Sequence, residues 1–474
     1  MDSINRGDIS KVLFKNTGII AVGQISTKII NFFLLPLYTA LLSKEEYGTI
    51  DLLSTYSSFL TVIVGVQLNQ AAFRFLVTNR EDKKKTEKVV STILLTALVT
   101  LAIYCTLFLV VQPFLTVGFK WFLLLHVAAS IYLQICSGMA RGMGDNISYA
   151  VGNFLSATIT LVINVLVVAV FHMGIESMLM AYIIGPVIGG TYVLERCKIL
   201  KYFFVLKAEK GIFRAMMQYA LPLIPNELSW SLLHSSDRFI VSNMLTVAAN
   251  GLVAVASKFS AIYTTVFSIF NTSWTEQVVL HYKDRGGKEY ISDMFDKMVT
   301  FFGTVAVAII VCMPFVFRLL VNQQFEEAYG MIPIYMMAVF FNAIIGMISA
   351  IYLIENETKI VAVSTGVAAL INIVTDVALI NFIGVYAAPV SSLCGYAVIS
   401  FWRLFDVNKR HCKIQMKKSN IIFLLIACAI SCISFYVEKI CIHVLALLAV
   451  SLIGFKINQK FFRELKQMVP FGKR

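Results

Sequence analysis

Four basic side chains interrupt long apolar stretches of the sequence, where charged residues are costly. Arg238 follows Asp237 in the stretch HSSDRFIVSNML, and Lys28, Arg74 and Lys258 lie in other apolar stretches. A charge near the centre of a bilayer costs about 2.5–3.5 kcal/mol, so such residues usually face a polar interior. Ammonium and guanidinium groups bind phosphate oxygens by charge and hydrogen bonds. The four cations therefore predict an anion-binding site within a membrane.

Two of these cations are also compatible with an interfacial role. Arg74 lies about one helical turn from a polar loop, and Lys258 lies toward the end of its stretch, so both side chains could extend to the membrane surface. Arg238 could neutralise Asp237, but adjacent helical residues point about 100° apart, so we do not expect the two to face each other.

The acidic residues of these stretches are fewer and more scattered. Glu227 lies mid-helix, and Asp376 lies deep in an apolar stretch. Ionisable residues inside a membrane commonly pair with a cation or form part of an ion pathway. Glu227, Asp237 and Asp376 are therefore candidates for ion coupling or charge pairing.

The composition predicts an all-α integral membrane protein. Of the 474 residues 58% are hydrophobic and only 14% are charged, and the mean hydropathy is +0.79. Apolar runs of about 20 residues, each long enough to cross a bilayer as a helix, recur along the whole chain and do not alternate as barrel strands would. We expect about fourteen transmembrane helices, over residues 12–42, 49–77, 89–111, 119–140, 147–171, 177–195, 215–245, 250–280, 294–320, 327–354, 359–383, 385–404, 420–437 and 441–457.

The distribution of basic residues predicts the orientation. Alternate loops, at residues 79–88, 195–214, 281–290 and 407–420, are basic, as is the C-terminal tail. The positive-inside rule places these loops and both termini in the cytoplasm. The net charge of +13 is then a topology signal that also attracts anionic membrane lipids. Nucleic acid is not an expected partner, because no soluble domain is available to bind it.

An internal repeat divides the chain into bundles. Aligning the sequence from Leu35 with that from Arg238 without a gap places Gly48 on Gly251 and Ser54 on Ser257, and the same shift of about 203 positions superposes basic loops. Six helices separate the copies, which predicts two six-helix bundles related by a pseudo-two-fold axis along the membrane normal. The expected parts are an N-terminal bundle (1–200), a C-terminal bundle (201–406), and two additional helices with a basic cytoplasmic tail (407–474).

Motifs for enzymatic chemistry are missing from the sequence. It has no P-loop, no H-E-x-x-H and no G-x-S-x-G, and no loop between the expected helices exceeds about 20 residues. The nine cysteines form no CxxC pair or Cys/His cluster, so we expect no metal site and no disulfide framework. We therefore expect a transporter with no catalytic residues and no cofactor.

Several stretches resemble a known family. The segments GQISTKIINFFLLPLYTALLSKEEYGTIDLL, QAAFRFL and YALPLIPNELSWSLLHSSDRFIVSNML resemble the polysaccharide-transport branch of the multidrug/oligosaccharidyl-lipid/polysaccharide flippase superfamily. The likeness is greatest to Wzx-type flippases for O-antigen (lipopolysaccharide), capsule or exopolysaccharide repeat units. The resemblance spans roughly residues 10–405 and rests on loose hydrophobic patterns.

The resemblance implies a bacterial plasma-membrane protein that moves an undecaprenyl-pyrophosphate-linked oligosaccharide to the outer leaflet by alternating access. The pyrophosphate would be held by Lys28, Arg74, Arg238 and Lys258, and the sugars would lie in a wet cavity with Trp230. Without an ATPase motif, the drive would come from an H⁺ or Na⁺ gradient, the membrane potential or consumption of the product. Polysaccharide polymerase and glycosyltransferases are implied partners.

Alternative functions remain open. A flippase for lipid II, or for a teichuronic-acid or sporulation-related glycan, handles the same anionic carrier and predicts nearly the same sequence. An ion-coupled multidrug antiporter of the superfamily would favour an acidic cleft, whereas this chain offers mostly bases. A membrane glycosyltransferase or polymerase predicts a large outer loop, and a scaffold would not need buried cations.

Overall fold

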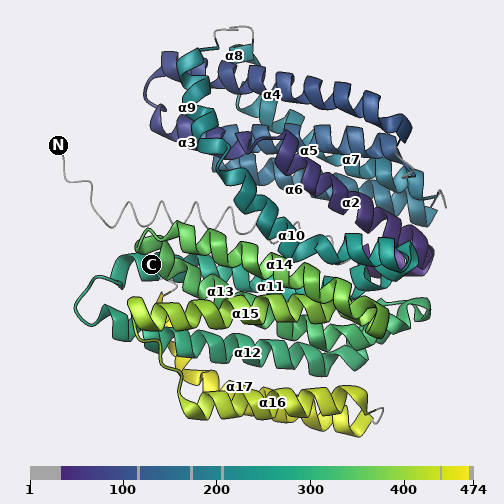
Figure 1. Ribbon diagram of the computed structural model, residues 1–474, viewed down its shortest axis with the longest axis vertical. Helices are drawn as coiled ribbons and strands as arrows, with labels where there is room; N and C mark the ends of the chain where they lie inside the picture. The colour runs from purple at the N-terminus through teal and green to yellow at the C-terminus, as the bar shows by residue number, and fades with distance from the viewer. Residues whose placement is uncertain are drawn as a thin grey trace. The chain divides into compact units, whose positions relative to one another are not determined.

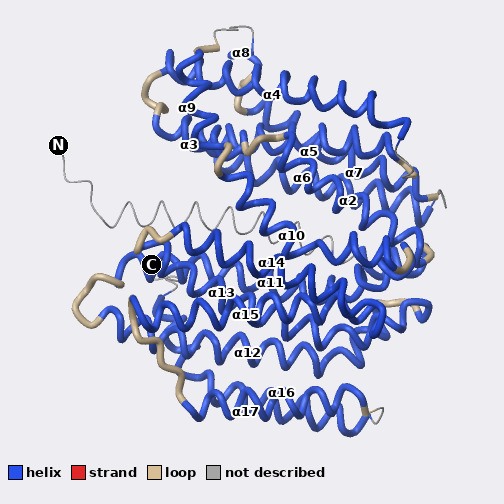
Figure 2. The backbone as a smooth tube through the Cα atoms, viewed as in Figure 1, coloured by secondary structure: helices blue, strands red, loops and turns tan. Residues whose placement is uncertain are grey.

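The computed structural model describes residue 32 and residues 34–114, 118–170, 174–203, 208–437 and 440–468 (Figure 1). These residues form helices joined by short loops, and none of them lies in a β-strand (Figure 2). The all-α fold expected from the sequence is confirmed.

The chain divides into two compact units. The first unit contains the residues up to Leu42 and Thr49–Ser231, and the second contains Ser43–Gly48 and the residues from Leu232 onward. The first unit thus includes the described residues between 201 and 231, which fall within the expected C-terminal bundle (201–406).

The first unit is built around helices whose starts are fixed by side-chain caps. The carboxylates of Asp82 and Asp145 accept hydrogen bonds from the backbone N–H groups of Lys85 and Ser148, which satisfies donors that a helix start leaves unpaired. Aliphatic side chains fill the core where α3, α4 and α5 meet. The helices are α2 (Lys44–Val64, whose first turn belongs to the second unit), α3 (Leu68–Thr78), α4 (Lys83–Val111), η1 (Gln112–Phe114), α5 (Lys120–Met143), α6 (Asn146–Asn164), the π-helical η2 (Val165–Val170), α7 (Ile175–Arg196), α8 (Leu200–Phe203) and α9 (Lys210–Ala220).

One membrane span of this unit is broken. The axes of α2 and α3 differ by 47° across residues 65–67. Val66 and Gln67 have φ angles of 46° and 52°, in the left-handed region that a β-branched residue such as valine seldom adopts. The neighbouring packing therefore holds the backbone in a strained conformation at this bend.

The second unit contains the remaining helices. α10 (Leu223–Met244) begins in the first unit and continues into the second; α9 and α10 are separate because Pro222 interrupts the helix between them. The last two helices, α16 and α17, pack on α12 through small and branched side chains, and Figure 1 shows them beside it. The helices after α10 are α11 (Val247–His281), α12 (Gly287–Leu320), η3 (Gln323–Met331), α13 (Ile332–Ile354), α14 (Thr358–Ile383), η4 (Gly384–Tyr386), α15 (Ala387–Arg410), α16 (Lys418–Tyr436) and α17 (Ile440–Met468).

The number of apolar spans accounts for most of the fourteen expected helices. Among the described residues ten helical segments are long and apolar enough to cross a membrane, or eleven if the bent pair α2–α3 counts as one span. The segment 359–410 holds two expected helices, α14 and α15, in one continuous stretch. α10 carries too many polar residues to qualify, and the first expected helix, at 12–42, lies largely outside the described residues.

Candidate functional site

The second unit contains a cluster of buried polar side chains from α10, α11 and α13. Asp237 and Arg238 are only 2% and 8% exposed. Arg238 Nη1 lies 3.2 Å from Asp237 Oδ2, and its Nη2 donates to Ser257 Oγ at 2.8 Å. Tyr335 donates its hydroxyl to the same Asp237 oxygen at 3.0 Å. The expectation that Asp237 and Arg238 would not face each other is wrong, because the long arginine side chain reaches back to its neighbour.

Asp376 of α14 is a fully buried carboxyl group near this cluster. Neither of its oxygens has a hydrogen-bond partner among the described residues. Asp376 lies one helical turn from Asn372, which contacts Ser236, the residue before Asp237. An ionised carboxylate without partners is strongly unfavourable in an apolar interior, whereas a protonated or cation-bound carboxyl group is not. Asp376 is therefore a candidate for binding a proton or a metal cation.

Asn372 lies one helical turn before Asp376 and extends the polar cluster. Its Oδ1 accepts a hydrogen bond from Ser236 Oγ at 2.8 Å. Its Nδ2 lies 3.5 Å from Ser391 Oγ and 3.4 Å from Ser392 Oγ on α15. Asn372 thus links α10, α14 and α15 by polar contacts one helical turn from Asp376. Asn372 is not among the residues predicted for the site, because a buried asparagine equally satisfies an ordinary helix–helix hydrogen bond.

The other predicted site residues are distributed over both units. Lys28 lies outside the described residues. In the first unit Arg74 is exposed on α3, and Glu227 and Trp230 are half-buried on α10. Lys258 is half-buried on α11 of the second unit. Within one unit the structure thus brings together Asp237, Arg238 and Asp376, while convergence of all four predicted cations stays a prediction.

Arg403 is a further buried cation, completely buried on α15, that was not predicted from the sequence. Its guanidinium group donates to Ser364 Oγ, Ser349 Oγ, Thr365 Oγ1 and the Val361 carbonyl oxygen, at 2.8–2.9 Å. The predicted helix 385–404 places Arg403 at its end, where a basic residue is ordinary. The serine and threonine in VSTG, residues 363–366, are the only sequence signal of its partners, and these residue types are too common to reveal it.

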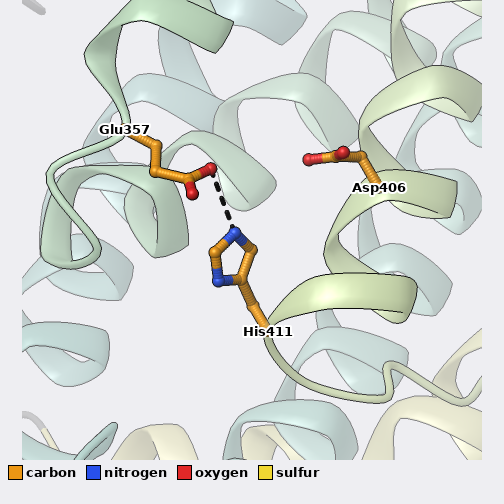
Figure 3. Close-up of side chains that lie close together, drawn as sticks. All are labelled: Glu357, Asp406 and His411. Carbon is orange, nitrogen blue, oxygen red and sulfur yellow. Dashed lines mark hydrogen bonds and ion pairs between the residues drawn. The ribbon is translucent and has the colours of Figure 1, made fainter.

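Three side chains at one end of the second unit have the composition of a metal site. The ligand atoms of Glu357, Asp406 and His411 lie within 4.8 Å of one another, and His411 Nε2 is 3.1 Å from Glu357 Oε2 (Figure 3). However, Arg410 Nη2 lies 3.4 Å from Glu357, and its Nε donates to Asp406 at 2.7 Å. Tyr352 also donates to Asp406 at 2.7 Å. The cluster is therefore explained as an ion-pair network between the start of α14 and the end of α15.

Solved structures of similar fold are membrane transporters. "Lipid II flippase MurJ, inward closed conformation" matches with a TM-score of 0.74 and 15% identity, over 94% of this chain and 99% of that chain. An inward-facing multidrug resistance MATE family transporter of the MOP superfamily matches with a TM-score of 0.68 and 12% identity, over 82% and 98%. A point mutant of the Vibrio cholerae MATE transporter VcmN matches with 0.59 and 12%, over 86% and 99%. The fold is thus that of a multi-pass membrane protein of the MurJ and MATE type.

The family follows from the sequence itself. Residues 13–275 match the family described as "Polysaccharide biosynthesis protein", and the chain belongs to that family. No curated protein has a significantly similar sequence. The resemblance noted from the quoted segments is confirmed at the level of the family and of the fold.

Proposed function

We propose that this protein is a flippase that moves an undecaprenyl-pyrophosphate-linked oligosaccharide repeat unit from the cytoplasmic to the outer leaflet of the bacterial cell membrane. The observation that carries the proposal is membership of the polysaccharide biosynthesis family together with a fold matched over nearly its whole length by a lipid II flippase. Repeat units for O-antigen, capsule or exopolysaccharide are the expected substrates, made by glycosyltransferases and used by a polymerase.

The cationic side chains would hold the pyrophosphate while the polyprenyl tail stays in lipid. Lys28, Arg74, Arg238 and Lys258 are the candidates, and Trp230 is a candidate surface for the sugars. Arg238 forms an ion pair with Asp237 at 3.2 Å. It would therefore bind a further anion less strongly than an arginine or lysine that has no acidic partner would. We therefore expect Arg74, which forms no ion pair with the described residues, to contribute more to pyrophosphate affinity than Arg238.

The buried carboxyl groups would couple transport to an ion gradient. Asp376 has two oxygens without hydrogen-bond partners among the described residues, which favours uptake of H⁺ or Na⁺. Asp237 and Asn372 would complete the surroundings of the ion, while Glu227, half-buried on α10, is the second coupling candidate. Binding of the ion removes the cost of an isolated buried charge and would favour one conformation of the second unit.

The test is flipping of a fluorescent polyprenyl-pyrophosphate oligosaccharide by the full chain in proteoliposomes. We expect wild type to move the lipid to the opposite leaflet and Lys28→Ala, Arg74→Ala and Arg238→Ala to slow this transfer, Arg74→Ala more than Arg238→Ala. We expect Asp376→Asn to remove the dependence on a Na⁺ or H⁺ gradient. No flipping of any polyprenyl-pyrophosphate glycan, including lipid II, would overturn the proposal, and gradient-driven efflux of ethidium instead would identify a drug antiporter.

A further inference from the structure

Two arginine side chains of the first unit, Arg74 of α3 and Arg141 of α5, make cation–π contacts with aromatic rings. The guanidinium carbon of Arg74 lies 4.2 Å from the ring centre of Tyr219 on α9, and Figure 1 shows α9 beside α3. The guanidinium carbon of Arg141 lies 4.5 Å from the ring centre of Phe73 and 5.3 Å from that of Tyr149. An aromatic face fixes a guanidinium group without consuming the N–H donors at its edge.

A third arginine reaches the same place from the turn between α3 and α4. Arg80 donates from Nε to the carbonyl oxygen of Gly142 at 2.5 Å and from Nη2 to the carbonyl oxygen of Arg141 at 2.7 Å. Its guanidinium group therefore rests on the backbone that carries Arg141. Arg141 lies over the ring of Phe73, and Arg74 is the next residue of α3, with its own side chain over Tyr219 of α9. The three arginines are called here the arginine trio.

The arginine trio has no anionic partner in the part of the chain that the structure describes: none of the three lies within ion-pair distance of a carboxylate there. Nearby lysines differ, since Lys88 pairs with Glu209 at 2.9 Å and Lys85 with Asp82 at 3.6 Å. In addition, the Nε atom of Arg141 is buried and has no hydrogen-bond acceptor among the described residues. Fixed cations with unused donors are what an oxyanion site requires.

We propose that Arg80 and Arg141 add to the pyrophosphate contact already assigned to Arg74, so that the arginine trio forms a receiving site where the lipid carrier first docks. This assignment rests on the proposed function. The trio borders the basic loop 79–88, which charge bias places on the cytoplasmic side, where the carrier's phosphates lie in the plane of the lipid headgroups. A guanidinium group can donate two parallel hydrogen bonds to two oxygens of one phosphate. A pyrophosphate has two phosphates and can therefore contact more than one arginine.

The phosphate chemistry could also come from an anionic membrane lipid, and a binding experiment separates the two sources. The full chain in neutral phosphatidylcholine nanodiscs is titrated with farnesyl pyrophosphate, and separately the fraction of phosphatidylglycerol in the disc is varied. We expect Arg141→Gln to weaken farnesyl pyrophosphate binding about tenfold, as expected for loss of charged hydrogen bonds. Arg141→Lys should restore part of the affinity, and Lys85→Gln, which removes an already paired cation, should leave it unchanged.

Flipping kinetics provide the second readout. A receiving site predicts that Arg141→Gln and Arg80→Gln raise the apparent KM for the fluorescent polyprenyl-pyrophosphate glycan while the maximal rate changes little. Unchanged binding and unchanged KM in folded Arg141→Gln would overturn the site but leave the flippase proposal intact. Weakened interaction with phosphatidylglycerol alone would overturn the assignment to the carrier. If the wild-type protein flips no carrier, the proposed function is wrong. The farnesyl pyrophosphate titration would then still show whether the arginine trio binds phosphate.

Discussion

Gly48 of α2 and Gly251 of α11 lie against each other in the second unit. A β-carbon on Gly48 would lie 2.0 Å from the carbonyl oxygen of Val247, and one on Gly251 would lie 2.2 Å from that of Lys44. Asn250 donates a hydrogen bond to the carbonyl oxygen of Gly48 at 3.0 Å. These two glycines are the pair that the internal sequence repeat aligned. Equivalent positions of the repeat therefore form a direct backbone contact that only glycine permits.

Replacing either glycine should destabilise the protein. We expect Gly48→Ala and Gly251→Ala each to cost about 1–3 kcal/mol, because the added methyl group would force two helix backbones apart. The measurement is the apparent melting temperature of the purified protein in detergent. Gly366→Ala on α14 is the control, since a β-carbon there has no atom within 4 Å. Equal melting of Gly48→Ala and this control would contradict the close contact.

Asp376 should make the stability of the protein depend on a cation. If Asp376 binds Na⁺, replacing choline by Na⁺ at about 100 times the dissociation constant stabilises the folded state by about 2.7 kcal/mol. Asp376→Asn should lose this effect, because the amide carries no charge to compensate. If a proton is the ligand instead, the melting temperature will follow pH rather than Na⁺. An Asp376→Asn variant that responds to both in the same way as wild type would remove Asp376 from the coupling site.

The helical fold was predictable from the sequence because its main determinant is local. Apolar runs long enough to cross a bilayer appear directly in the sequence, although the expected helix 215–245 is divided at Pro222 into α9 and α10. The bend at Val66 and Gln67 was not predicted: Gly65 directly precedes it, but neither left-handed position is itself a glycine.

The candidate site was predicted only in part. The sequence identified Asp237, Arg238 and Asp376 as charged residues in apolar stretches. The free-energy cost of a charge in the membrane can be inferred from the surrounding sequence without knowledge of the fold. The sequence did not predict which side chains meet, because the helix–helix contacts that place Tyr335 and Asn372 beside them are non-local. The same limit explains why the ion pair between adjacent Asp237 and Arg238 was not expected.

Arg403 should be essential for stability although it has no carboxylate partner among the described residues. Arg403→Met would leave the Val361 carbonyl oxygen and nearby hydroxyl groups without their charged donor, at a cost of at least about 3 kcal/mol. Arg403→Lys should rescue little, since an ammonium group cannot reproduce the planar arrangement of four hydrogen bonds. Thermal unfolding in detergent measures both, with Lys409→Met, an exposed position of the same helix, as the control. Full stability of Arg403→Lys would show that charge alone suffices.

Two cysteines should differ sharply in reactivity. Burial raises the pKa of the Cys412 thiol, in the loop between α15 and α16, to about 11. At pH 8 only about one molecule in a thousand then carries the reactive thiolate. Cys441, at the start of α17, is exposed. In single-cysteine variants we expect a maleimide to modify Cys441 and to leave Cys412 largely unmodified.

The same variants test the orientation in the membrane. The basic loop 407–420 is predicted to be cytoplasmic, so α16 should cross outward and bring Cys441 to the outer surface. A membrane-impermeant maleimide added to intact cells should therefore modify Cys441 without permeabilisation. Modification of Cys441 only after the cells are permeabilised would place the loop before α17 in the cytoplasm. The arginine trio would then face the outer side, and a receiving site for a cytoplasmic carrier would no longer be possible there.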